Sequence, residues 1–134
     1  MSDPNRKPDD ERVRQNARSD LSADLFLGAG AGSGKTNLLV DRYLHILESE
    51  RARPGQIVAV TFTTRAAAEM RGRLREACRS RAATDPTGRW QQLARELELA
   101  PIDTIHGLCT RILRESALAA RLDPSFRVLE DTEA

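Results

Sequence analysis

The chain has 134 residues, of which 40% are hydrophobic and only 4% aromatic, enough for one modest core in a single domain. Its formal net charge is +1, so the composition provides no general basic field that would indicate a nucleic-acid partner. The arginines are nevertheless unevenly distributed. Five of them fall within one helix-like stretch: Arg71, Arg73, Arg75, Arg79 and Arg81.

The sequence also indicates in which cellular compartment the protein is expected. No apolar run approaches the roughly 20 residues that a membrane span requires, and the acidic N-terminus lacks the apolar core of a secretory signal. Cys78 and Cys109 lie far apart without the spacing of metal ligands, so both are expected to be reduced thiols. We therefore expect a cytoplasmic protein with no membrane partner.

The N-terminal third predicts a tail, a helix, a strand and a second helix in that order. Residues 1–9 are polar, contain two prolines and are predicted to form a disordered tail, followed by one domain over residues 10–134. A short helix is predicted at 10–18. Residues 25–27 are apolar and predict a strand, and residues 35–50 carry an apolar face at helical spacing.

Between that strand and helix, residues 29–36 read Ala-Gly-Ala-Gly-Ser-Gly-Lys-Thr, the pattern of a phosphate-binding loop. Glycines allow positive backbone torsions, so that successive N–H groups can surround an anion. Lys35 is expected to neutralise the β- and γ-phosphates of ATP, and the Thr36 hydroxyl to ligate Mg²⁺. Of 21 basic residues only Lys7 and Lys35 are lysines, and a compact ammonium suits a phosphate site better than a planar guanidinium. The predicted ATP-binding residues are Ala29, Gly30, Ala31, Gly32, Ser33, Gly34, Lys35 and Thr36.

The remainder of the chain alternates strands with helices. A continuous β-prone run at 57–62 predicts a strand buried on both faces of a parallel sheet, and Thr63 or Thr64 can cap the next helix. The further predicted elements are a helix at 90–97, a short strand at 102–105, a helix at 106–122 and a last short strand at 126–129. This alternation predicts an α/β fold of the P-loop NTPase (RecA-like) type, a parallel sheet flanked by helices and incomplete in this chain.

Polar side chains follow two of the predicted strands at their carboxyl ends, the edge where open α/β sheets bind ligands. At the first, the hydroxyls of Thr61 and Thr63 can bond phosphate oxygens and Phe62 can stack on a base. The competing interpretation is that Thr63 and Thr64 only cap a helix and Phe62 belongs to the core. At the second strand end, Thr104 and His106 are compatible with a contact to backbone or nucleic acid and with a plain helix cap. His106 has no partner at ligand spacing, so a metal site is not expected.

The order and spacing of these segments resemble the first three helicase motifs of the UvrD/Rep superfamily, the superfamily-one DNA helicases. The segments are residues 29–36, 57–73 and 104–108. Residues 102–113 and 122–129 most resemble the AddA/RecB branch, the helicase–nuclease subunits of recombination repair. The resemblance implies an ATP-dependent DNA helicase that moves along single-stranded DNA in repair or recombination, with a partner subunit in a helicase–nuclease complex.

Carried over by position, the resemblance makes Lys35 and Thr36 the catalytic residues, acting with ATP and Mg²⁺. It places contacts to single-stranded DNA at Thr61, Phe62, Thr63, Ala66, Thr104 and His106. Gln15 is the candidate for the family's glutamine that reads the adenine edge, although Arg14 occupies the ungapped place. Arg65 stands where the family usually has lysine.

The family's next motif, with an Asp for Mg²⁺ and a Glu that activates water, falls beyond Ala134, as does the second RecA-like domain. Phosphoryl transfer needs all of these parts. We therefore expect an N-terminal fragment of a longer helicase that by itself neither hydrolyses ATP at a useful rate nor unwinds DNA. A partial sheet is also expected to leave apolar surface uncovered. The alternatives are a free-standing, non-hydrolytic nucleotide- or DNA-binding module and a small-molecule P-loop kinase.

Overall fold

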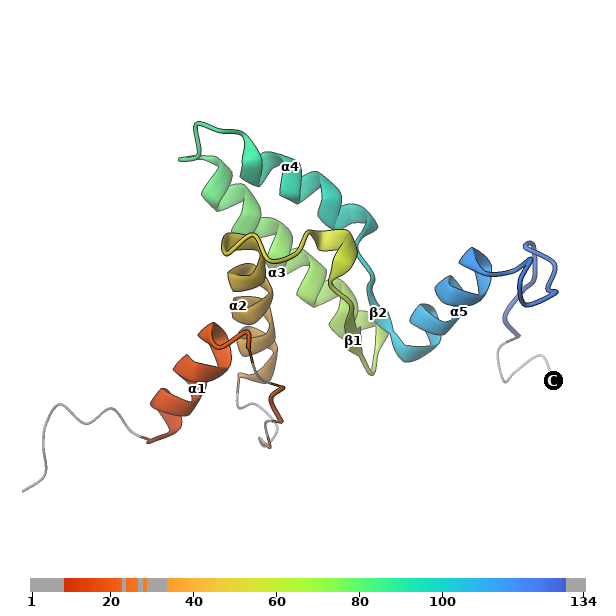
Figure 1. The fold of residues 1–134 in the computed structure, drawn as a ribbon, viewed down its shortest axis with the longest axis horizontal. Helices are drawn as coiled ribbons and strands as arrows, with labels where there is room; N and C mark the ends of the chain where they lie inside the picture. The colour runs from red at the N-terminus through yellow and green to blue at the C-terminus, as the bar shows by residue number, and fades with distance from the viewer. Residues whose placement is uncertain (1–8, 23, 27, 29–33, 130–134) are drawn as a thin grey trace, which may run out of the picture.

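The computed structural model of the chain describes residues 9–22, 24–26, 28 and 34–129. Within that part, helices and short strands alternate along the chain in an α/β arrangement (Figure 1). The elements are α1 (Asp9–Ser19), α2 (Lys35–Glu48), β1 (Ala59–Thr61), α3 (Thr64–Ala82), α4 (Arg89–Glu96), β2 (Ile102–Thr104) and α5 (Ile105–Glu115). Two 3-10 helices, Pro54–Gln56 and Leu97–Leu99, precede the strands. No helix in these ranges is both long and apolar enough to cross a membrane.

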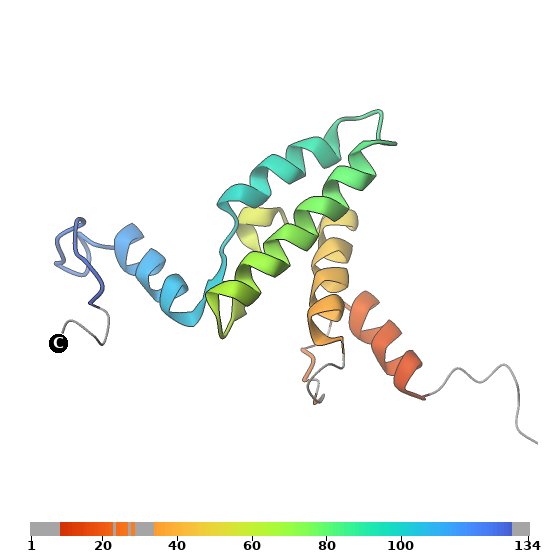
Figure 2. The same cartoon turned by 180° about the vertical axis from the view of Figure 1, so that it is seen from behind.

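The two strands form a parallel pair, with Ala59 opposite Ile102 and Thr61 opposite Thr104. Parallel strands need a crossover connection, which here consists of α3 and α4. These two helices run antiparallel as a hairpin, and α3 packs against both strands (Figures 1 and 2). The predicted parallel α/β arrangement is therefore confirmed at this level.

The hydrophobic core lies where α2, the α3–α4 hairpin and β2 meet. In α3, Met70, Leu74 and Cys78 recur every four residues and thus share one buried face. The core cluster consists of Val40, Tyr43, Leu44, Leu47, Met70, Leu74, Cys78, Leu93, Leu97, Ala100 and Ile102. The phenol of Tyr43 also donates a hydrogen bond to the carbonyl oxygen of Pro54 at 3.3 Å, which ties α2 to the segment before β1.

The two cysteines differ in their expected reactivity. Cys78 is buried in the core, where burial raises the pKa of its thiol to about 11 despite the opposing effect of Arg81, whereas Cys109 is exposed. Because the thiolate is the reactive form, iodoacetamide at pH 8 is expected to label Cys109 in the native chain and to leave Cys78 unmodified until denaturant is added. Peptide mass spectrometry distinguishes the two sites. Equally fast labelling of Cys78 in the native chain would contradict the described core.

Two predicted strands are absent from the described structure. Leu25 and Phe26 lie outside any strand, Phe26 is 97% exposed, and Leu27 falls outside the described residues. The run at 126–129 also forms no strand. An apolar run becomes a strand only when a neighbouring strand satisfies its backbone groups, and neither run has such a neighbour among the described residues.

Other boundaries also differ from the prediction. The strand expected at 57–62 is limited to Ala59–Thr61, and it is not buried on both faces, since Val58 and Val60 are 56% and 41% exposed. This uncovered apolar face agrees with a partial sheet. The helix expected at 106–122 ends at Glu115, after which turns follow. Asp9 begins α1, and residues 1–8 of the predicted tail lie outside the described part.

Candidate nucleotide and nucleic-acid site

The described end of the glycine-rich loop forms the first turn of α2. Gly34 is the N-cap and has φ 79° and ψ 20°, a left-handed conformation that glycine adopts without strain. The N–H of Leu38 donates to the Gly34 carbonyl oxygen at 3.0 Å, so the N–H groups of residues 35–37 precede the helical ladder. Lys35 is exposed and Thr36 is half-buried. The remaining predicted loop residues, Ala29, Gly30, Ala31, Gly32 and Ser33, lie outside the described residues.

This first turn differs from those of the three helices that follow it. Helices α3 and α5 are capped by the hydroxyls of Thr63 and Thr104, each of which accepts a backbone N–H at 3.1 Å. Helix α4 also begins at a left-handed glycine, Gly88, but there Asp85 accepts the N–H of Trp90 at 3.0 Å. In the described part of the chain, α2 has neither a side-chain cap nor an acidic residue in its first turn. Its N-terminus therefore fits an anion such as a phosphate group.

The other two predicted segments meet at the carboxyl ends of β1 and β2. Thr61 lies opposite Thr104, and adjacent strands are about 4.8 Å apart. Each strand leads directly into a helix, so both helix N-termini lie at this edge (Figure 1). Phe62 follows β1 and is 95% exposed, and His106 is also exposed. The interpretation of Phe62 as a core residue is therefore wrong.

The threonine hydroxyls at this edge already make local hydrogen bonds. Thr61 Oγ1 donates to the carbonyl oxygen of Thr63 at 2.9 Å, and Thr63 Oγ1 accepts the N–H of the half-buried Ala66. A hydroxyl that caps a helix uses a lone pair and keeps its own hydrogen, which can still donate to a phosphate oxygen. For Thr63 and Thr104, helix capping and ligand binding are thus compatible roles.

A close approach shapes the junction between β2 and α5. A Cβ on Gly107 would clash with the carboxylate of Asp103, so a larger residue at this position would require that side chain to move. Asp103 Oδ1 also accepts the N–H of Thr104 at 2.7 Å. The carboxylate therefore already lies at the positive end of α5, and a phosphate approaching that end would compete with it.

Comparison with known proteins covers all three predicted motif segments, residues 29–36, 57–73 and 104–108. Residues 10–134 match the family described as the UvrD/REP helicase N-terminal domain. The chain belongs to the UvrD/REP helicase family. The predicted superfamily is thereby confirmed, and this membership leaves the small-molecule kinase alternative without support.

Relatives of this UvrD/REP helicase chain are named as a subunit of an ATP-dependent helicase/nuclease. The chain is 40% identical over 131 residues to that protein of Limosilactobacillus fermentum, a match covering 91% of this chain and 10% of the relative. It is 42% identical over 117 residues to that of Desulforudis audaxviator, covering 83% of this chain and 9% of the relative. It is 40% identical over 114 residues to that of Heliobacterium modesticaldum, covering 84% and 8%. The chain thus spans about a tenth of the length of the curated relatives it matches.

Within this UvrD/REP helicase unit, one contact at the first turn of α2 was not predicted. Arg73 of α3 donates to the side-chain oxygen of Asn37, in the first turn of α2, and also pairs with Glu69 at 2.6 Å. The four-residue spacing of Glu69 and Arg73 indicates a pair on one helix face. Nothing in the sequence indicates that this arginine, among the five of its cluster, reaches across to α2.

The two candidate residues of α1 lie in different surroundings. Gln15 is exposed, and its backbone carbonyl oxygen accepts the hydroxyl of Ser19 at 2.9 Å. Arg14 is half-buried, and its Nη1 lies 3.7 Å from the place that a Cβ on Gly34 would take. Arg14 is therefore adjacent to the described end of the glycine-rich loop.

Proposed function

We propose that this chain is the ATP-binding portion of an ATP-dependent DNA helicase, part of a RecA-like P-loop domain that acts on single-stranded DNA in repair or recombination. The observation that carries the proposal is the combination of two features in one small α/β unit. One is the first turn of α2, which fits a phosphate; the other is the exposed Phe62 beside the paired ends of β1 and β2. Relatives named as one subunit of an ATP-dependent helicase/nuclease support both the motor and the existence of a partner chain.

In this proposal the chain's own groups hold the triphosphate. Residues 29–34 supply backbone N–H groups, Lys35 neutralises the β- and γ-phosphates, and the Thr36 hydroxyl ligates Mg²⁺. The bound Mg²⁺ would supply further charge neutralisation on the phosphates.

Two other predictions are not tested by the geometry of the phosphate site. Recognition of the adenine edge by Gln15 stays a prediction. The free thiols of Cys78 and Cys109 support a cytoplasmic location.

Phe62→Ala is expected to weaken binding of single-stranded DNA roughly 5- to 150-fold, because stacking of a base on an aromatic ring contributes about 1–3 kcal/mol. The measurement is fluorescence anisotropy of a labelled 12-nucleotide strand at fixed salt. Val58→Ala is the matched control, because Val58 is an exposed apolar residue before β1 and not at its carboxyl end. Equal affinity of the two variants for DNA would contradict stacking on Phe62.

ATP hydrolysis provides the second test. We expect this chain to bind Mg-ATP without turning it over, because phosphoryl transfer requires groups beyond the phosphate cradle. DNA-stimulated hydrolysis by the purified chain, abolished by Lys35→Ala, would contradict that expectation. The alternative of a free-standing binding module predicts nucleotide affinity that does not change when DNA is added.

A further inference from the structure

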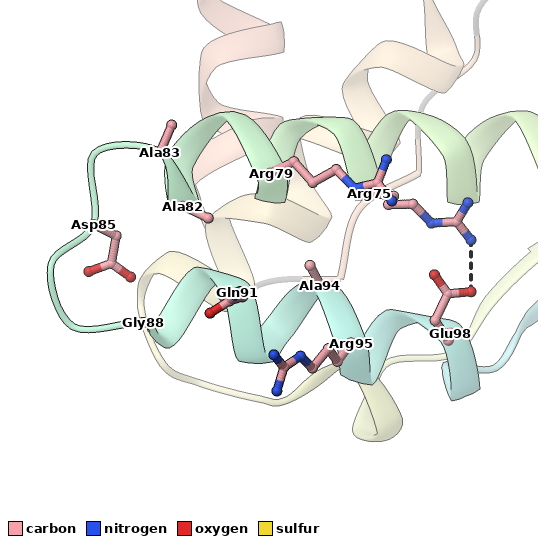
Figure 3. A pocket seen from close by; sticks show the side chains of 10 residues that line it. All are labelled: Arg75, Arg79, Ala82, Ala83, Asp85, Gly88, Gln91, Ala94, Arg95 and Glu98. Carbon is pink, nitrogen blue, oxygen red and sulfur yellow. Dashed lines mark hydrogen bonds and ion pairs between the residues drawn. The ribbon is translucent and has the colours of Figure 1, made fainter.

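The α3–α4 hairpin holds an open groove of about 540 Å³ that the nucleotide and strand-end segments do not use (Figure 3). Its walls come from the second half of α3 and from α4, with the turn between them closing one end. The charged and amide side chains that line it are Arg75, Arg79, Asp85, Gln91, Arg95 and Glu98.

The two carboxylates of the groove are already bound to its own walls. Glu98 pairs with Arg75 across the groove at 2.8 Å, the dashed contact in Figure 3. Asp85 accepts the hydroxyl of Thr87 at 2.6 Å and the N–H of Trp90 at 3.0 Å, and these hydrogen bonds, that of Thr87 foremost, lower the pKa of its carboxyl. Glu98 is thus neutralised by Arg75, whereas Asp85 keeps its negative charge at the turn end of the groove and forms no ion pair with another described residue.

The remaining cations of the groove are Arg79 on α3 and Arg95 on α4. Both are exposed, and neither side chain forms a hydrogen bond or ion pair with another described residue. The side-chain amide of Gln91 is likewise unpaired within the described ranges, and Nε of Arg75 is buried without a partner there. The groove is thus lined by two guanidinium groups and one amide whose N–H donors have no partner among the described residues.

Most of the other arginines of the same cluster on α3 form ion pairs, so an unpaired guanidinium group is not typical of this helix. Arg73 pairs with Glu69, Arg75 with Glu98 and Arg81 with Glu48. The planar fork of arginine matches phosphate oxygens in a bidentate manner. The unpaired donors of the groove therefore fit a phosphate-bearing polymer.

We propose that the α3–α4 groove binds the phosphodiester backbone of DNA, with Arg79 and Arg95 donating to phosphate oxygens. The proposal rests on the proposed function, since α3 begins at the strand-end surface beside Phe62 and continues to the groove. From Thr63 to Arg79 is 16 residues along α3, or about 24 Å at 1.5 Å per residue. A single strand can extend beyond the roughly 3.4 Å per nucleotide of a duplex strand, so only a strand of two or three nucleotides is certain to be too short to reach both surfaces.

The test compares the double variant R79Q/R95Q with the parent chain and with Arg127→Gln. Arg127 is also exposed and unpaired among the described residues, and it follows α5 in the chain, outside the α3–α4 hairpin. Affinity for labelled 3- and 24-nucleotide strands is measured by anisotropy over a range of salt concentrations. We expect the double variant to bind the 3-mer as the parent does and the 24-mer at least about 10-fold more weakly. Its slope of log K against log salt on the 24-mer should be smaller by about 1.4, for two lost phosphate contacts.

The outcomes separate the two proposals. If the parent binds the 24-mer and the double variant retains that affinity and salt slope, the groove proposal is overturned and the proposed function stands. If the parent binds neither strand, the proposed function fails as well. Arg127→Gln removes one charge where the double variant removes two, so a loss in Arg127→Gln of half the binding free energy that the double variant loses would assign the effect to net charge and overturn the groove as a site. Polyglutamate that binds the parent but not the double variant, with DNA affinity unchanged, would assign the groove to an acidic protein.

Discussion

Lys35→Ala is expected to weaken binding of Mg-ATP roughly 10- to 150-fold, because a hydrogen bond to a charged group contributes about 1.5–3 kcal/mol. Lys35 is exposed at the first turn of α2, where no described side chain satisfies the helix N-terminus. Titration with a fluorescent ATP analogue in the presence of Mg²⁺ measures the dissociation constant. Since only the phosphates are involved, GTP should lose affinity by the same factor.

The chain provides its own matched control for this experiment. Its one other lysine is Lys7, and Lys7→Ala makes the same chemical change in the N-terminal segment. That variant should bind the nucleotide as the parent does. Thr36→Ala should weaken binding of ATP in the presence of Mg²⁺ and change binding of ATP without Mg²⁺ much less. Unchanged binding in Lys35→Ala would show that the glycine-rich segment is not a phosphate site.

Leu74→Ala is expected to destabilise the native state by about 2–5 kcal/mol, the usual cost of emptying a buried leucine site. Leu74 is fully buried at the centre of α3, between α2, α4 and β2. Stabilities of small domains are about 5–15 kcal/mol, so the loss should lower the melting temperature by roughly 10 °C or more, or leave the chain unfolded. Circular dichroism during heating and in urea measures both.

Leu118→Ala is the control, because Leu118 is 86% exposed and loses the same atoms without leaving a cavity. Its melting temperature should stay within about a degree or two of the parent's. If both variants melted like the parent, the packing described for the core would be wrong.

Helices and their N-terminal ends were the most predictable part of this fold. Helix α3 combines an apolar face at Met70, Leu74 and Cys78 with a capping threonine, and both signals are local in the sequence. Strands were less predictable, since pairing depends on a distant segment. The Leu25 to Leu27 run and the 57–62 run look alike locally, but within the described residues only the second has a partner strand.

The site was predictable in its residue types and much less so in its surroundings. The glycine-rich loop and the two strand-end segments follow from spacing, but the exposure of Phe62 depends on what covers the sheet edge. The contact of Arg73 with Asn37 and the shared groove of Arg79 and Arg95 depend on how α3 packs against α2 and α4. Such packing brings together residues whose separation in sequence carries no signal.

Helix α3 has a mechanical consequence for the whole unit. It starts beside Phe62, touches the first turn of α2 through Arg73, and ends along the groove at Arg79. Packed helices shift as whole bodies by small sliding movements. In the proposed function, a displacement of the α2 turn by an incoming triphosphate would therefore be passed through Arg73 to both ends of α3. The affinity for a nucleic acid at those ends would then change when the nucleotide binds.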